Sequence, residues 1–418
     1  MTISTAAART DAWTPARLKF AAPLRNERMS ASSDHADYLG LENIESWTGR
    51  IIEGESKSND TTDDDAGLAN VFKEGDVLFG KLRPYLAKAC HAPRDGVCST
   101  ELLVMRPAEF LHPRFLLYSL LTPDFVGAVD ASTFGAKMPR ASGDFLGSLE
   151  IRVPPIEAQA IIAAYLDRET ARIDGLIAEK ERMLALLEEK RAALISRVVT
   201  RGLDPNVPLK PSGQEWLGEI PAHWRVERAK NLFTVRDERS DDGSEELLTV
   251  SHITGVTSRS EKNVYMFEAD DKAGYKRCMP GDLVINTLWA WMGAMGISPL
   301  AGIVSPDYHV YTSKGDLVPE YVDLLCRSRP FVAEVSRWSK GVWSSRLRLY
   351  PENFFEMRLP VPPHDEQAAI VRAVEADQRK ANALSESLQL SITLAKERRA
   401  ALITAAVTGQ IPPEEMRG

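Results

Sequence analysis

The sequence predicts an α+β fold in which two similar mixed α/β domains are separated by two long helices, packed on each other as an antiparallel coiled coil. Three observations predict it: a repeat at a constant offset, a long proline-free segment in each copy, and a diverged module before each such segment. A chain of 418 residues is expected to hold two or more domains.

The repeat is clearest in two short runs. Val153-Pro-Pro opens the first copy and residues 189–200 close it. The same pattern returns 208 residues further on, where Val361-Pro-Pro opens the second copy and residues 397–408 close it. Eight of the 12 positions in the closing run are identical. Chance does not produce this agreement, so the chain is an internal duplication.

Each copy ends in a segment that predicts one long helix. Proline cannot continue a helix, and the acidic residues that follow, Glu157 in one copy and Asp365 in the other, suit a helix N-terminus. No proline follows until Pro205 or Pro412. Roughly 40 residues therefore remain, or about 60 Å of helix.

Apolar residues recur at heptad spacing along both segments, with charged residues on the other faces. They include Leu166, Ile173, Leu187 and Leu194 in the first copy and Val374, Leu388 and Leu402 in the second. A helix with one apolar stripe must bury it, and an antiparallel pair is the economical solution. The alternative is two core helices in separate globular domains.

The boundaries expected from these patterns divide the chain into seven parts. They are an N-terminal tail (1–16), a first module (17–156), a central helix (157–202), a proline-rich connector (203–216), a second module (217–364), a C-terminal helix (365–409) and a tail (410–418). The modules share three features in the same order. These are a short strand (38–44 and 248–253), a turn feeding a strand (74–79 and 280–285) and a short helix (113–121 and 319–325).

Composition indicates the cellular compartment and the kinds of partner to expect. The uncharged stretch 283–306 is long enough to span a membrane, but its counterpart 77–88 is charged, so we interpret both as strand–turn segments. The four cysteines show no CxxC spacing, and the N-terminus lacks the apolar run of a signal peptide. A cytoplasmic protein with no membrane partner is the expectation. The net charge of −8 argues weakly against binding nucleic acid over the whole surface.

No catalytic motif is complete. Residues 75–82 resemble a phosphate-binding loop, but Leu82 stands where a magnesium-binding hydroxyl is required, and Arg83-Pro84 blocks the helix that should follow. The seven histidines have no triad or ligand spacing. We expect neither a catalytic centre nor a metal site in this chain.

Basic and aromatic residues gather at matching places in the two modules. Arginine pairs with guanine edges, and lysine and arginine neutralise phosphates, so these residues are candidate DNA contacts. Arg140 and Arg348 are equivalent in the repeat. The full set of candidates is Lys81, Arg83, Lys88, Lys137 and Arg140 in the first module and Trp289, Trp291, Arg337, Lys340, Arg346 and Arg348 in the second.

These patterns together resemble the specificity subunit of type I restriction–modification enzymes. The resemblance covers almost the whole chain. It is carried by residues 38–44, by the two Val-Pro-Pro segments, by residues 133–140, and by the connector segments 200–208 and 218–224. It implies two target-recognition domains, each reading one half of a split sequence in double-stranded DNA.

The resemblance also implies partners. Two methyltransferase subunits would dock on the helices and bind S-adenosylmethionine, and restriction/translocase subunits using ATP and Mg would join them. No cofactor is expected on this chain itself. The expected partner contacts lie at the two helix starts, at Glu157, Gln159, Asp365 and Gln367.

Two readers on a stiff helical pair would meet the duplex at a fixed separation near one helical turn, ~34–36 Å. The DNA sequence recognised and the spacer length depend on loop geometry that the sequence does not specify. The main rival is a two-module coiled-coil scaffold that joins protein partners without reading DNA. A catalytic role in methyl transfer is the weaker rival.

Overall fold

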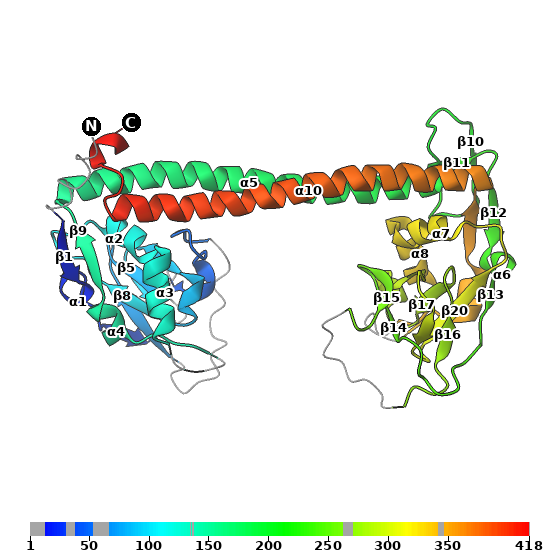
Figure 1. The fold of residues 1–418 in the computed structure, drawn as a ribbon, viewed down its shortest axis with the longest axis horizontal. Coiled ribbons are helices and arrows are strands. Elements are labelled where there is room, and N and C mark those ends of the chain that lie inside the picture. The colour runs from blue at the N-terminus through cyan, green and yellow to red at the C-terminus, as the bar shows by residue number, and fades with distance from the viewer. Residues whose placement is uncertain are drawn as a thin grey trace, which may run out of the picture. The chain divides into compact units, whose positions relative to one another are not determined.

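The computed structural model describes residues 13–30, 38–52, 67–133, 135, 138–261, 271–341 and 347–417. The chain forms two compact units. The first contains Met1–Glu181 and Gln389–Gly418, and the second contains Arg182–Leu388. Each unit therefore consists of one sheet-rich module and one half of each long helix, α5 (Ile156–Arg201) and α10 (His364–Val407) (Figure 1).

The two helix halves in the first unit run antiparallel. Asp174 of α5 pairs with Arg399 of α10 at 2.8 Å, and Glu181 pairs with Lys396 at 3.7 Å. The residue number falls on α10 as it rises on α5, which defines the direction. The predicted fold class, two mixed α/β domains separated by two long helices in an antiparallel coiled coil, is confirmed.

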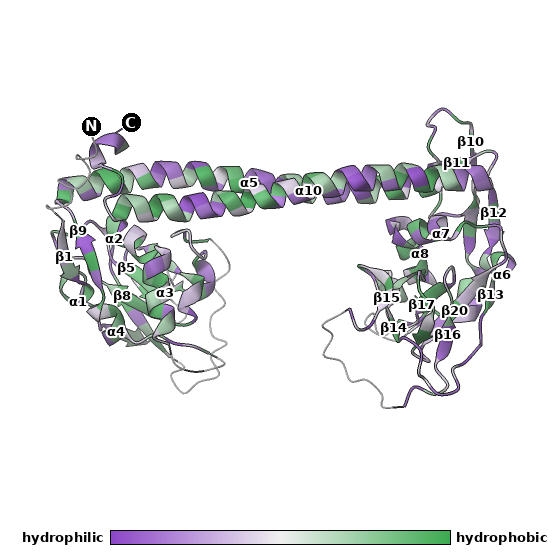
Figure 2. Cartoon of the chain, viewed as in Figure 1, coloured by the Kyte–Doolittle hydropathy of each residue, from purple (hydrophilic) through white to green (hydrophobic). Residues whose placement is uncertain are grey.

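Four of the seven heptad residues named above, Leu166, Ile173, Val374 and Leu388, are buried, and Leu187, Leu194 and Leu402 are partly buried. In the second unit, Ile195 and Val198 of α5 share one core with Ile370 and Val374 of α10. Figure 2 shows both helices as alternating apolar and polar bands, as expected when one face is buried and the other meets water.

The first module begins with a strand that pairs with the strand preceding α5. This pair, β1 (Thr14–Arg17) and β9 (Glu150–Val153), is antiparallel. One sheet has the order β6-β5-β8 and another has the order β2-β4-β7-β3. Their strands are β2 (Arg28–Ser30), β3 (Tyr38–Leu39), β4 (Leu68–Phe72), β5 (Val77–Gly80), β6 (Ala89–His91), β7 (Gly96–Cys98) and β8 (Leu102–Met105).

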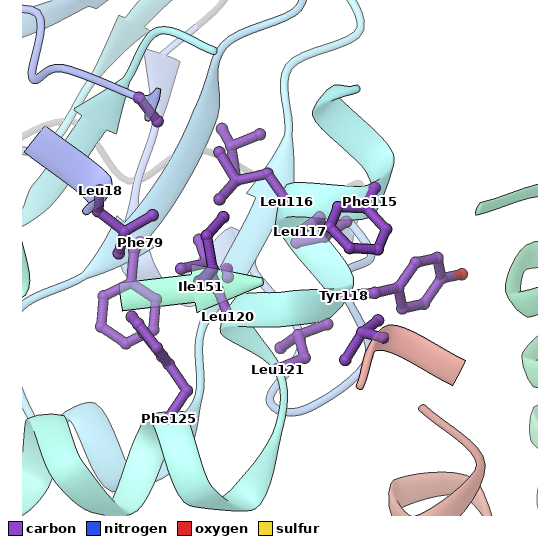
Figure 3. Packing of buried hydrophobic residues seen from close by; sticks show 14 of the residues in the cluster. Leu18, Phe79, Phe115, Leu116, Leu117, Tyr118, Leu120, Leu121, Phe125 and Ile151 are labelled. Carbon is purple, nitrogen blue, oxygen red and sulfur yellow. The ribbon is translucent and has the colours of Figure 1, made fainter. Parts of the chain in front are cut away.

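Short helices complete the first module. They are α1 (Leu18–Ala21), α2 (Pro113–Leu120), α3 (Pro123–Ala131) and α4 (Gly143–Ser148), with 3-10 helices η1 (Leu41–Asn43) and η2 (Pro84–Leu86). The core lies between α2, α3 and β5. There Phe79 meets Phe125 edge-on at 5.9 Å, while Phe115, Leu116 and Leu120 of α2 fill the centre (Figure 3). The C-terminal 3-10 helix η5 (Pro413–Met416) buries Met416 in the same core.

The second module repeats this plan. Its strand pairs and sheets are β10-β11, β12-β21, β13-β20-β17-β18, β14-β15 and β16-β19. The strands are β10 (Leu209–Pro211), β11 (Glu219–Pro221), β12 (Arg225–Arg228), β13 (Phe233–Val235), β14 (Leu248–Ser251), β15 (Gly255–Ser258), β16 (Lys276–Cys278), β17 (Leu283–Asn286), β18 (Met295–Ile297), β19 (Gly302–Val304), β20 (Tyr308–Ser313) and β21 (Arg358–Val361). The helices are α6 (Ala229–Leu232), α7 (Pro319–Arg327), α8 (Arg329–Trp338), α9 (Pro351–Glu356) and 3-10 helix η3 (Ala290–Met292).

The register of the central strands repeats as well. Val77 of β5 pairs with Met105 of β8, and Leu283 of β17 pairs with Tyr311 of β20, each 206 residues later. The modules therefore share one backbone plan although their sequences have diverged.

Local details refine the sequence interpretation. Residues 38–44 form only a two-residue strand followed by η1. The strand–turn interpretation of residues 283–306 is confirmed, because β17, η3, β18 and β19 occupy them. Among the described residues, no helix combines the length and apolarity needed to cross a membrane.

Candidate nucleic-acid interface

A buried glutamine ties each module to the start of its long helix. Gln159 accepts the His112 N–H at 2.7 Å and donates to the carbonyls of Phe110 and Pro154 at 2.9 and 2.7 Å. Gln367 makes the same three bonds in the second unit, with Val318 N–H at 2.7 Å and with the Asp316 and Pro362 carbonyls at 2.9 Å. Both side chains are 0% exposed.

A second repeated device braces the turn before the central strand. Arg25 grips Asp76 with Nε and Nη2, at 2.8 and 3.3 Å. Arg236 grips Asp282 in the same way, at 2.7 and 3.3 Å. Both carboxylates are buried, and each also accepts a backbone N–H three residues earlier. A bidentate arginine is the strong form of this contact, so both turns are held rigidly against the sheet.

The first module presents its candidate DNA contacts on the segment that follows β5. Backbone bonds join this segment to residues 139–141: Arg83 N–H donates to Pro139, and Ala141 N–H donates to Lys81, both at 2.9 Å. These bonds bring Lys81 and Arg83 close to Arg140 in the fold. Arg83 is exposed, and Arg140 forms an ion pair with Glu101 at 3.1 Å.

Lys88 lies at the end of the same segment, where its ammonium group donates to the Leu41 carbonyl at 2.6 Å. The sequence interpretation omitted Tyr85, which lies in η2 between these cations and is 46% exposed. Tyr85 could have been found from the repeat, because it aligns with Trp291 at an offset of 206 residues. The segment thus carries cations and an exposed aromatic ring around one short turn.

The equivalent segment of the second module replaces cations with indoles. Trp289 immediately precedes η3 and Trp291 lies within it, just as Arg83 precedes η2 and Tyr85 lies within it. The two indole rings stack with their centroids 6.3 Å apart. Trp289 is 50% exposed. The backbone bond to the neighbouring segment is also repeated, since Leu349 N–H donates to Thr287 at 3.2 Å.

Two cations adjoin this second turn. Lys340 and Arg348 are both exposed and pair through their backbones, each N–H donating to the other's carbonyl at 2.9 Å. Arg337 is held by two 2.8 Å bonds to Glu334, and these bonds raise the pKa of its guanidinium. Lys137 and Arg346 lie outside the described residues.

The residues expected to contact partners divide into two kinds. Glu157 and Asp365 are exposed in the first turns of α5 and α10. Gln159 and Gln367 present no surface, so burial favours a structural role for the two glutamines. A partner contact at Glu157 or Asp365 stays a prediction.

Exposed leucines on the long helices form a repeated pair that the heptad analysis missed. Leu176 and Leu394 are 48% and 54% exposed in the first unit, and both line a groove of about 640 Å³. Their equivalents 208 residues away, Leu384 and Leu186, are 46% and 56% exposed in the second unit. Similar exposure at equivalent positions indicates that the same apolar surface is present in both units. We call these pairs the leucine patches.

The described part of the chain contains no cluster of three or more metal-ligating side chains. All four cysteines are buried. Burial raises the pKa of the Cys90 thiol to about 12 and that of Cys278 to about 11, which keeps both protonated and poorly nucleophilic.

Parts of this sequence are similar to known proteins. Residues 27–183 match the family model described as the type I restriction modification DNA specificity domain. The chain is 23% identical over 190 residues to the type I restriction enzyme EcoDI specificity subunit of Escherichia coli, covering 46% of this chain and 38% of that protein. It is 22% identical over 322 residues to the EcoBI specificity subunit of E. coli, covering 71% and 65%. The matches thus span less than two thirds of these two relatives.

Two solved structures share the fold over nearly their whole length. One is a chain from a study of complex assembly and conformational transition of the type I R-M system, with a TM-score of 0.70, 19% identity and coverage of 96% of this chain and 98% of that one. The other is the HsdS subunit from Thermoanaerobacter tengcongensis, with a TM-score of 0.51, 18% identity and coverage of 96% and 97%.

The fold consists of two modules joined to one helical pair, and residues 27–183 match the model of the type I restriction modification DNA specificity domain. The resemblance of this chain to the specificity subunit of type I restriction–modification enzymes is therefore confirmed.

Proposed function

We propose that this chain is the non-catalytic DNA-recognition subunit of a type I restriction–modification complex. Each module reads one half of a bipartite target in double-stranded DNA. The observation that carries the proposal is the segment after the central strand, which the duplication kept in both modules with different side chains. Arg83 and Tyr85 in one, and Trp289 and Trp291 in the other, suit two different half-sites.

The helical pair is the second part of the proposal. A continuous α5 of 46 residues and α10 of 44 residues would set the spacing between the half-sites. Each leucine patch would receive one methyltransferase subunit, since two equivalent patches suit two copies of one partner. S-adenosylmethionine, ATP and Mg are assigned to the methyltransferase and restriction/translocase subunits.

In vitro selection of the full chain on a random-sequence duplex library tests DNA reading. We expect a motif of two fixed blocks around an unread spacer. Arg83→Ala should weaken binding by roughly 1–3 kcal/mol through one block, and Arg348→Ala through the other, where each touches a base. A variant that only lowers the salt dependence has lost a phosphate contact instead.

The rival scaffold function makes the opposite prediction. A chain that only joins proteins would enrich no sequence. At low salt it would show no duplex binding that depends on the basic side chains of the modules. A matched control is Arg17→Ala: this exposed arginine, paired with Glu150 at 3.2 Å on the β1–β9 strand pair, lies outside the proposed interface. Its binding should equal that of the parent chain.

A further inference from the structure

Three non-glycine residues among those described have a left-handed backbone, and all belong to the first module. They are Trp47 (φ 66°), Arg83 (φ 50°) and Ala87 (φ 46°). Residues with a Cβ atom avoid this conformation, so it persists only where the surrounding structure holds it. Arg83 and Ala87 bracket η2, the turn proposed to read DNA.

Hydrogen bonds connect these strained residues to the helical pair. Trp47 N–H donates to the Ala87 carbonyl at 3.1 Å. The Trp47 carbonyl accepts from Nη1 of Arg399 at 2.7 Å, and the Thr48 carbonyl accepts from Nη2 at 3.2 Å. Nε of Arg399 donates to Asp174 of α5 at 2.8 Å. One side chain thus joins the loop 47–48, α10 and α5.

The junction is buried and ionic. Arg399 is 7% exposed, and the Asp174 side chain is 8% exposed. A buried guanidinium requires its hydrogen-bond partners, because removing one partner of a buried ion pair leaves the other charge buried and uncompensated, which is strongly destabilising. Asp174 adjoins Gly175 and Leu176, and Arg399 adjoins Arg398, and these three neighbours line the groove of the first leucine patch.

The second half of the chain lacks the equivalent junction. At an offset of 208, Arg399 corresponds to Arg191 and Asp174 corresponds to Asn382. Asparagine cannot form the ion pair. Trp289, the counterpart of Arg83, has an ordinary φ of −124°. Gly293, the counterpart of Ala87, keeps a positive φ of 93°, which glycine adopts without strain. Among the described residues, the left-handed non-glycine backbone and the Arg399–Asp174 ion pair are therefore both features of the first unit alone.

We propose that Arg399 is a positioning residue for the first half-site: through Trp47 and Ala87 it holds the η2 turn in the geometry that presents Arg83 and Tyr85 to DNA. This inference rests on the proposed DNA-reading function. Base discrimination requires side chains held to within a fraction of an ångström by a supporting shell. The same residue places the reading turn in mechanical contact with the helix surface beside the leucine patch.

The test compares Arg399→Gln with Arg191→Gln in the full chain, using selection on the random-sequence duplex library. The block weakened by Arg83→Ala identifies the first half-site. Arg399→Gln should lower the preference for that block about tenfold and leave the other block unchanged. Arg191→Gln should change neither. Asp174→Asn should reproduce the Arg399 effect.

Ala87→Gly separates positioning from folding. Glycine adopts a positive φ without steric cost, and this gain offsets the loss of the buried Ala87 methyl group, so the thermal midpoint should change little. The freed turn should nevertheless lose discrimination at the first block. Equal loss at both blocks in Arg399→Gln, or unchanged discrimination in both Arg399→Gln and Ala87→Gly, would overturn the positioning role. If the parent chain itself enriches no motif, the DNA-reading proposal fails, and the positioning role fails with it.

Discussion

Replacing the buried glutamines should destabilise the two units by the same amount, each in its own unit. Gln159→Ala removes three hydrogen bonds of 2.7–2.9 Å, and Gln367→Ala removes three of 2.7–2.9 Å. At about 1 kcal/mol for each bond, the expected loss is about 3 kcal/mol at either position. A water molecule admitted to the space would reduce it, and the orphaned backbone groups would increase it.

The assay must resolve the units, because a chain with two compact units need not unfold in a single transition. Hydrogen exchange of the amides in α2 (residues 113–120) and α7 (residues 319–327) reports local opening next to each glutamine. Gln159→Ala should accelerate exchange in α2 and leave α7 unchanged, and Gln367→Ala should do the reverse. Glu157→Gln, an exposed change at the same helix start, should alter neither by more than about 0.5 kcal/mol.

Two outcomes would contradict the structural role of the glutamines. If both glutamine variants keep parental exchange rates while losing a methyltransferase partner, the glutamines contact that partner and the structural assignment is wrong. Loss of protection in both units from one substitution would refute the independence of the two anchors.

Two further predictions concern other parts of the molecule. Burial, followed by the charge of Lys276, lowers the pKa of His309 to about 4, so the unfolded chain binds a proton between pH 6.5 and 4 that the folded chain does not; stability of the second unit should therefore fall as pH drops through that window, and urea titrations of His309→Gln should lose this pH dependence. Leu394→Glu and Leu186→Glu should each abolish binding of one of two methyltransferase copies, measured as a change in the mass of the purified complex, and a complex with both copies retained would contradict the assignment of the leucine patches.

The long helices and the duplication could be read from the sequence because their causes are local or periodic. Proline breaks a helix interior but is favoured at the first helical position, and a heptad stripe marks the buried face of α5 whatever it packs against. The short helices beginning at Pro113 and Pro319 were predictable for the same reason. The pairing of the stretch 283–306 with its counterpart 77–88 likewise located the two strand–turn segments.

The identity of the site residues was only partly predictable. The heptad pattern treats an exposed leucine and a buried one alike, so Leu176 and Leu394 were missed, since exposure depends on which neighbours the partner helix supplies. The glutamines were noticed for their position at the helix starts, but their burial depends on backbone groups about 50 residues away in the chain.

The sequence by itself determined that this chain is a duplication with two long amphipathic helices and two diverged modules, because repeats, proline and heptads act through neighbouring residues. Only the tertiary structure decided what Arg399 does. Its partners Asp174, Trp47 and Thr48 are 225 to 352 residues distant, and their geometry arises from the packing of three separate segments. Neither charge nor spacing in the sequence predicts these contacts, because they form only when segments far apart in the chain pack together.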